Sequence, residues 1–226
     1  MAGGNEIRIL RAGDRAAVAW KNAGGVTREI AAWPEGAGLA DFGWRISLAE
    51  VAADGPFSGF PGVDRTLTLA EGAGMDLTVA GARRLVDERY APQDFPGDAP
   101  TDCRLLDGPV VNFNVMYRRD RVRARTAVVR GTLALTTEPG ETLLVVALLG
   151  PAELQAGTGL VAGTEREGGT EREAGPGLEA GTGPGTASGP VVLGPYDAVR
   201  ISGAGTWSLG TRGHAAVVRL AARPGR

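Results

Sequence analysis

Histidine, cysteine and lysine each occur only once in this chain of 226 residues, and these absences exclude several kinds of site. A metal site with three histidine ligands cannot be built from His214 alone, and carboxylates without softer ligands suit transition metals poorly. Cys103 has no second cysteine to pair with and lacks a plausible basic partner to activate its thiol. We therefore expect no metal site and no cofactor, a buried Cys103, and a His214 at a strand edge or on the surface.

Long hydrophobic runs and a large excess of charge are also missing. The longest apolar run, 143–149, is far too short to cross a bilayer, and the N-terminal residues lack the apolar segment of a signal peptide. The net charge of −2 and the pI of about 5.6 do not favour binding to nucleic acid or to an anionic membrane. We expect a cytoplasmic protein that binds neither.

Helical periodicity is absent as well, and short alternating segments separated by glycine and proline take its place. This pattern predicts an all-β sandwich or barrel. In residues 44–49, Trp44, Ile46 and Leu48 share one face and Arg45 and Ser47 the other, which is typical of a half-buried strand.

The alternation resumes in residues 64–69, where Arg65 lies on the same side as Leu67 and Leu69. A turn rich in glycine, residues 71–74, then leads into another alternating segment, residues 75–79. The two segments are predicted to pair as a hairpin.

Residues 110–117 form a third alternating segment, with Asn112, Asn114 and Met116 on one face. Asparagine is disfavoured inside strands, so two on one face need an explanation. They form either a buried structural hydrogen-bonded pair or a polar patch in a concave site. Arg45 and Ser47 belong either to the same site or to a solvated outer face.

The single lysine, Lys21, stands out because every other basic side chain is one of 23 arginines. Such a position favours a compact ammonium over a planar guanidinium. Lys21 and Asn22 precede the turn at Gly24 and Gly25, so they are either an exposed lysine and an Asx turn or ligand contacts at a barrel mouth.

Residues 156–189 interrupt the strand pattern with glycine, threonine, glutamate and alanine, including the repeated sequence GTERE. Because this segment has almost no large apolar side chain to bury, we expect a disordered insertion in a loop that folding does not require.

Four segments together resemble the HutD/Ves family: WKNAGGVTREI at 20–30, WRIS at 44–47, DGPFSGFPGVDR at 54–65 and GPVVNFNVM at 108–116. The likeness is good over roughly residues 7–150. Ala23 stands where the family usually has glycine, and the insertion at 156–189 is a larger departure.

The resemblance implies a double-stranded β-helix of the cupin or jelly-roll type, with two such units in one chain. We place the first unit at residues 1–120 and the second at 121–226. The resemblance also implies an association with histidine utilisation, as a sensor or governor.

Our main hypothesis is a metal-free cupin-like protein that binds a small carboxylate or amide. The expected ligand contacts are Lys21, Asn22, Arg45, Ser47, Asn112 and Asn114, and the resemblance suggests N-formylglutamate as the ligand. One rival is an isomerase or hydrolase that uses Lys21 and Glu29 as acid and base. Another is a structural protein, such as a homodimer, that uses the polar strand faces as its contact surface.

Overall fold

The computed structural model describes residues 6–20, 23–157 and 189–223, and the regular secondary structure in these ranges consists almost entirely of antiparallel strands. One 3-10 helix, η1 (Ala12–Asp14), is the exception, so the expectation of an all-β fold is confirmed. None of the helices in these ranges is long and apolar enough to cross a membrane. Most of the predicted insertion at 156–189 lies outside the described residues.

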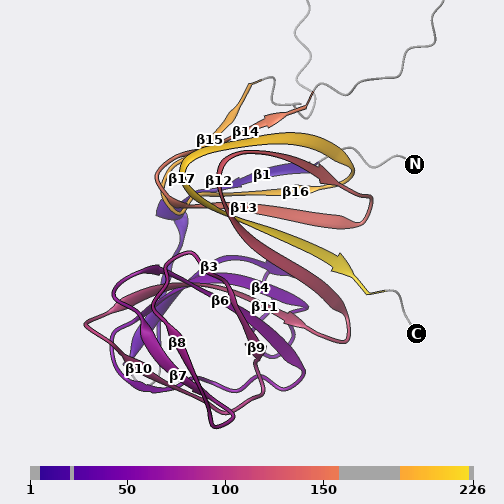
Figure 1. The fold of residues 1–226 in the computed structure, drawn as a ribbon. Helices are drawn as coiled ribbons and strands as arrows, with labels where there is room; N and C mark the ends of the chain where they lie inside the picture. The colour runs from indigo at the N-terminus through magenta and orange to yellow at the C-terminus, as the bar shows by residue number, and fades with distance from the viewer. Residues whose placement is uncertain (1–5, 21–22, 158–188, 224–226) are drawn as a thin grey trace, which may run out of the picture.

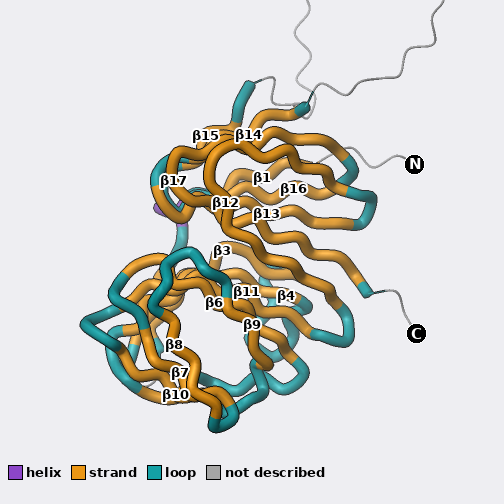
Figure 2. Tube along the Cα trace, in the orientation of Figure 1, coloured by secondary structure: helices purple, strands orange, loops and turns teal. Residues whose placement is uncertain are grey.

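The N-terminal half consists of two sheets that close into a barrel (Figures 1 and 2). The six-stranded sheet has the order β2 (Ala17–Ala19), β3 (Gly25–Trp33), β4 (Trp44–Val51), β11 (Val110–Arg118), β6 (Val63–Glu71) and β9 (Gln93–Pro96). The four-stranded sheet has the order β5 (Gly55–Pro56), β10 (Thr101–Leu105), β7 (Met75–Val79) and β8 (Ala82–Val86).

The C-terminal half consists of a single seven-stranded sheet that curls around its own core (Figure 2). Its main order is β1 (Glu6–Leu10), β16 (Ala198–Ser202), β13 (Glu141–Leu149), β17 (Gly205–Ala222), β14 (Ala152–Ala156) and β15 (Val191–Leu193). The long strand β12 (Val122–Thr137) pairs with β17.

The first strand of the chain belongs to the second barrel, which differs from the expected division into residues 1–120 and 121–226. Strand β1 pairs antiparallel with β16, from Glu6 opposite Ser202 to Leu10 opposite Ala198. Leu10 packs against the core between the two halves and Ile7 against the core of the C-terminal half, so burial of these side chains favours this position.

The predicted hairpin between residues 64–69 and 75–79 is wrong, because β6 and β7 lie in different sheets. Strand β6 pairs with β11 and β9, whereas β7 pairs with β10 and β8. The glycine-rich segment between them is a corner rather than a hairpin turn. Gly72 and Gly74 there have φ of 96° and 119°, a region that favours glycine.

The two sheets of the N-terminal half enclose an apolar core. The six-stranded sheet contributes Val51, Leu67, Leu69, Phe95 and Val110. The four-stranded sheet contributes Met75, Leu77, Val79 and Cys103, joined by Val86 at the end of β8. This core fixes the inward face of β4, β6 and β11, on which the candidate site lies.

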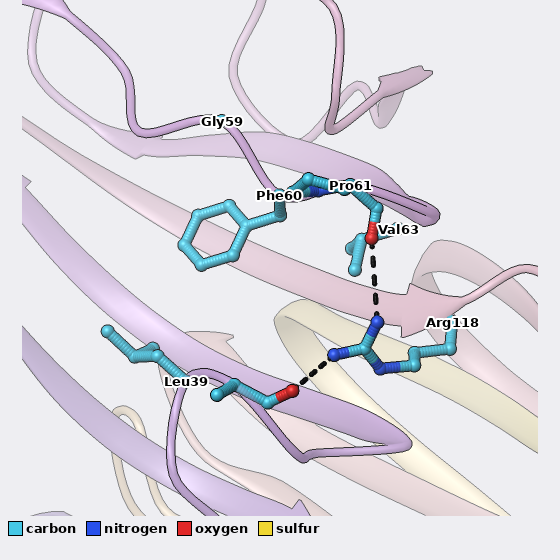
Figure 3. Close-up of a pocket in the computed structure, with 7 residues that line it drawn as sticks. Leu39, Gly59, Phe60, Pro61, Val63 and Arg118 are labelled. Atoms are coloured by element: carbon cyan, nitrogen blue, oxygen red, sulfur yellow. Dashed lines mark hydrogen bonds between the residues drawn. The ribbon is translucent and has the colours of Figure 1, made fainter.

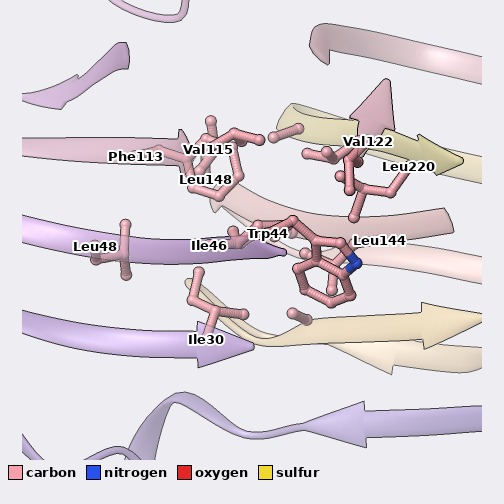
Figure 4. Packing of buried hydrophobic residues seen from close by; sticks show 14 residues of the cluster. Ile30, Trp44, Ile46, Leu48, Phe113, Val115, Val122, Leu144, Leu148 and Leu220 are labelled. Atoms are coloured by element: carbon pink, nitrogen blue, oxygen red, sulfur yellow. The ribbon is translucent and has the colours of Figure 1, made fainter. Parts of the chain in front are cut away.

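The other face of the six-stranded sheet packs against the C-terminal half (Figure 4). Trp44, Ile46 and Leu48 lie here with Leu144 and Leu220 of the C-terminal sheet. The alternation of β4 therefore does not mark a half-buried strand with one solvated face, because both faces are covered. The apolar side chains point away from the N-terminal barrel and the polar ones point into it.

The C-terminal half has a separate and almost entirely apolar interior. Its buried cluster comes from β12 to β17: Leu135, Leu143, Val145, Ala147, Ala152, Leu154, Val191, Leu193, Val199, Ile201, Trp207, Leu209, Ala215 and Val217. The described residues of this barrel do not include a row of buried polar side chains like that of the N-terminal barrel.

Replacing Ile46, which has no exposed surface, with alanine should lower the free energy of unfolding by about 2–5 kcal/mol. The reason is that the substitution leaves a cavity in the core that joins the two halves. Equilibrium unfolding in urea measures the change. Val18→Ala is the control, since Val18 is 64% exposed and its change should stay within about 0.5 kcal/mol. Equal effects of the two substitutions would contradict the importance of this core.

Candidate functional site

Four of the residues singled out in the sequence share the inward face of the six-stranded sheet. On β4 and β11, Ser47 lies opposite Asn114 and Arg45 opposite Met116, while Ala49 lies opposite Asn112. Ser47, Asn112 and Asn114 are 3%, 1% and 4% exposed. The polar faces of these strands therefore point into the barrel and do not form a solvated outer surface.

Arg65 on β6 completes this row, although it was not among the ligand contacts expected from the sequence. Its Nη2 donates a hydrogen bond to Asn114 Oδ1 at 3.1 Å. Its guanidinium carbon lies 5.0 Å from the centre of the Phe57 ring and 5.3 Å from that of Phe95. The signal was visible in the sequence, because Arg65 shares a strand face with Leu67 and Leu69.

The charge of Arg65 has no counter-ion in the described part of the chain. Its Nε is fully buried without a hydrogen-bond partner, although the side chain as a whole keeps some accessible surface. Burial lowers the pKa of Arg65 to about 10, so the guanidinium still carries its charge at neutral pH. A buried cation without an anion is costly, and such a group is suited to binding an anionic ligand.

Asn112 adds a second unsatisfied polar group to the same wall. Among the described residues, its Nδ2 has only the sulfur of Met75 as a partner, at 3.8 Å, and its Oδ1 has none. Buried amides normally make hydrogen bonds, so this pair is not the satisfied structural pair that the sequence left open. The wall can still donate and accept hydrogen bonds.

Arg45 differs from Arg65 because its charge is already paired. Its Nε donates to Glu29 Oε2 at 2.7 Å, and the side chains of Arg45 and Glu29 are 14% and 40% exposed. Of the two arginines on the inward face, Arg65 is therefore the one with charge available for a ligand.

Lys21 and Asn22 lie outside the described residues, but their neighbours show where this turn begins and ends. Trp20 N donates to Gly25 O at 2.9 Å, and Gly25 pairs with Val51. Val51 and Arg45 are six positions apart on β4, or about 20 Å at the rise of a strand. The ends of this turn and Arg45 thus lie at opposite ends of β4.

A hollow of about 430 Å³ opens at the end of the barrel beyond Arg45 (Figure 3). Its wall includes Phe60, Val63 and Arg118. The guanidinium of Arg118 already donates hydrogen bonds to backbone oxygens. Its acceptors are the carbonyl oxygens of Phe42 at 3.2 Å and Pro61 at 3.5 Å, and also that of Ala40.

An apolar cluster lies between this hollow and Arg65. Val63 and Phe60 belong both to the wall of the hollow and to a cluster with Phe42 and Met116, and Met116 lies opposite Arg65 in the sheet. Arg65 is therefore not among the residues that line the hollow.

The single histidine and cysteine lie apart from the inward row of β4, β6 and β11. His214 was expected at a strand edge or on the surface, but it is half-buried. Its ring stacks on that of Tyr90 in the N-terminal half, with 4.1 Å between the ring centres. Cys103 is buried as expected, and burial raises the pKa of its thiol to about 11. Among the described residues, no three histidine, cysteine, aspartate or glutamate side chains lie together as metal ligands would.

Comparison with known proteins agrees with this architecture. An uncharacterised 21.2 kDa protein in the hutC 3′ region of Pseudomonas putida is 37% identical over 143 residues, covering 63% of this chain and 75% of that protein. Protein Ves of Cronobacter sakazakii is 38% identical over 129 residues, covering 57% of this chain and 70% of that protein.

Solved structures extend the likeness to nearly the whole chain. HutD from Pseudomonas fluorescens SBW25, in a formate condition, superposes with a TM-score of 0.75 at 29% identity and covers 97% of this chain and 100% of that one. A cupin 2 conserved barrel domain protein from Leptotrichia buccalis shares the fold alone, with a TM-score of 0.51, 8% identity and 91% and 92% coverage. The sequence profile of the HutD family matches residues 12–167, and the chain, a cupin-type protein, belongs to that family.

Proposed function

We propose that the N-terminal barrel binds a small carboxylate, with Arg65 as its main charge partner. The observation that carries this proposal is the buried guanidinium of Arg65, which no carboxylate of the described residues neutralises. Arginine and carboxylate form strong charge-assisted hydrogen bonds, often two in parallel. A ligand carboxylate would supply the missing anion.

The surroundings of Arg65 match a small ligand with one charged and one polar end. Phe57 and Phe95 provide apolar walls beside the guanidinium, and Asn112 and Ser47 provide hydrogen-bonding groups further along the sheet. Binding sites of this kind usually combine apolar walls with a few convergent polar groups.

The family association with histidine utilisation narrows the choice of carboxylate. N-formylglutamate carries carboxylates for Arg65 and a formamide that could pair with Asn112. Formate, which is named in the condition of the solved HutD from Pseudomonas fluorescens, is the smallest carboxylate. We therefore propose a sensor or governor that responds to such an intermediate.

The geometry favours binding over the two rival functions. In the described part of the chain, the guanidinium of Arg65 contacts the Asn114 amide and the rings of Phe57 and Phe95, and none of these groups exchanges protons readily near neutral pH. Glu29, the base of the enzyme hypothesis, is engaged with Arg45. The buried positions of Ser47, Asn112 and Asn114 also argue against a dimer contact through these polar faces.

Arg65→Gln should weaken the binding of N-formyl-L-glutamate by about ten- to a hundredfold, because a charge-assisted hydrogen bond is lost. Calorimetric titration of both proteins measures the change. Arg212→Gln is the matched control, because Arg212 is exposed and lies on β17, in the other half of the protein. If this ligand does not bind the wild type, a thermal-shift screen of small carboxylates selects the probe. No carboxylate binding, or binding that Arg65→Gln leaves unchanged, would refute the proposal.

Arg65→Met should raise the free energy of unfolding of the ligand-free protein by about 1 kcal/mol or more, because it removes a buried and unpaired charge. Such a gain in stability together with a loss of binding is typical of a residue kept for function. Urea unfolding without ligand gives the value, and Arg212→Met should change it by less than about 0.5 kcal/mol. A clear loss of stability would mean that Arg65 mainly supports the fold.

Lys21→Arg tests the part of the site that lies outside the described residues. If the ammonium contacts the ligand, the larger guanidinium should cost about 1.5–3 kcal/mol of binding free energy and leave the melting temperature unchanged. Titration and a melting curve for each protein provide the comparison. Equal affinities would exclude Lys21 as a ligand contact.

A further inference from the structure

A second hollow, of about 300 Å³, lies between the two halves of the molecule. The N-terminal half contributes Leu48 of β4 and Glu71 of β6 to its wall, and the C-terminal half contributes Tyr196, which precedes β16. Arg15, from the segment that joins β1 to the N-terminal barrel, also lines the hollow. Its volume is at the lower end of the range for small-molecule sites.

Two opposite charges on this wall lack ion-pair partners in the described part of the chain. Arg15 donates to the backbone oxygens of Tyr196 at 2.7 Å and Leu10 at 2.9 Å, and its Nε is buried without a partner. Glu71 accepts a hydrogen bond from the Tyr196 hydroxyl but forms no ion pair.

The other charged groups around the hollow are already engaged. Arg28 and Glu50, which also line it, pair with each other. Asp197 lies near Arg15, but its carboxylate is bound by Arg11 at 2.7 Å and by the Ala12 amide at 2.7 Å. Arg15 and Glu71 therefore remain as one cation and one anion on the same small hollow.

We propose that this hollow binds a free amino acid as a zwitterion, with its carboxylate on Arg15 and its ammonium on Glu71. A simple anion would be repelled by Glu71 and a simple cation by Arg15, whereas a zwitterion satisfies both. Leu48 offers an apolar surface for the side chain of the ligand.

The site is separate from the one in the N-terminal barrel. Leu48 and Ser47 are neighbours on β4 and point to opposite faces of the sheet, so the two sites lie back to back. An amino acid bound between Arg15 and Glu71 would also bridge the two halves, whose direct polar contacts include the hydrogen bond from Tyr196 to Glu71.

Calorimetric titration with L-alanine, L-glutamine and L-histidine tests the proposal. At least one of them should bind to the wild type. For a ligand that binds, the N-acetyl derivative lacks the ammonium and the amide lacks the carboxylate. Each of these derivatives should bind at least about tenfold more weakly than the amino acid itself. No binding by any of the three, or equal binding of the singly charged derivatives, would overturn the proposal.

Substitutions then locate the binding site. Glu71→Gln and Arg15→Gln should each weaken binding of the amino acid by about tenfold or more, and the exposed controls Glu153→Gln and Arg212→Gln should not. Glu71→Gln keeps an acceptor for the Tyr196 hydroxyl, so it tests the site even if Arg15→Gln does not fold.

Arg65→Gln separates this proposal from the carboxylate site. If Arg65→Gln leaves the affinity for the amino acid intact and Glu71→Gln reduces it, the result supports a second site. A loss caused by Arg65→Gln alone would place the amino acid in the N-terminal barrel, which would overturn this proposal and support the first one. Unchanged affinity in Glu71→Gln would overturn it as well.

Discussion

The packing of Trp44, Ile46 and Leu48 against the C-terminal sheet is the interaction on which the candidate carboxylate site depends. Because these side chains need apolar partners outside the N-terminal barrel, the alternate positions of β4 must face its interior. Those positions carry Arg45 and Ser47, and β11 adds Asn112 in the same way. Docking of the C-terminal half therefore makes a polar barrel interior compatible with a stable fold.

The two barrels share an architecture but differ in what their interiors contain. The C-terminal core is filled with aliphatic side chains and Trp207, which stabilise the sheet and leave a ligand little to recognise. The N-terminal core is apolar at the four-stranded sheet but keeps an arginine and amides on β6 and β11. The candidate ligand contacts therefore lie in the N-terminal half, whereas the interior of the C-terminal half is apolar.

Period-two alternation was enough to predict the strands at residues 44–49, 64–69, 75–79 and 110–117, because it depends on local geometry alone. Alternation does not show which part of the protein covers each face of a strand. It therefore predicts correctly that the apolar face of β4 is buried, but it does not decide between solvent and the barrel interior for the polar face. The predicted pairing of residues 64–69 with residues 75–79 is wrong because a turn sequence does not reveal that the chain passes from one sheet to another. The alternation places Arg65 on the same face as Leu67 and Leu69, but a charged side chain is normally expected to reach solvent, and the contacts of its guanidinium with Phe57 and Phe95 show that it points into the barrel.

Strand β1 has a consequence for how the protein is made on the ribosome. Its partner β16 begins at Ala198, so β1 cannot pair until β2 to β15 and then β16 itself have been synthesised. Until then the backbone groups of β1 that pair with β16 lack their native partners, and the side chain of Ile7 lacks the core against which it packs. The N-terminal barrel, residues 17–118, can form earlier because its sheets close within that range. Vectorial synthesis thus favours an N-terminal barrel that folds first and a C-terminal barrel whose closure completes the molecule.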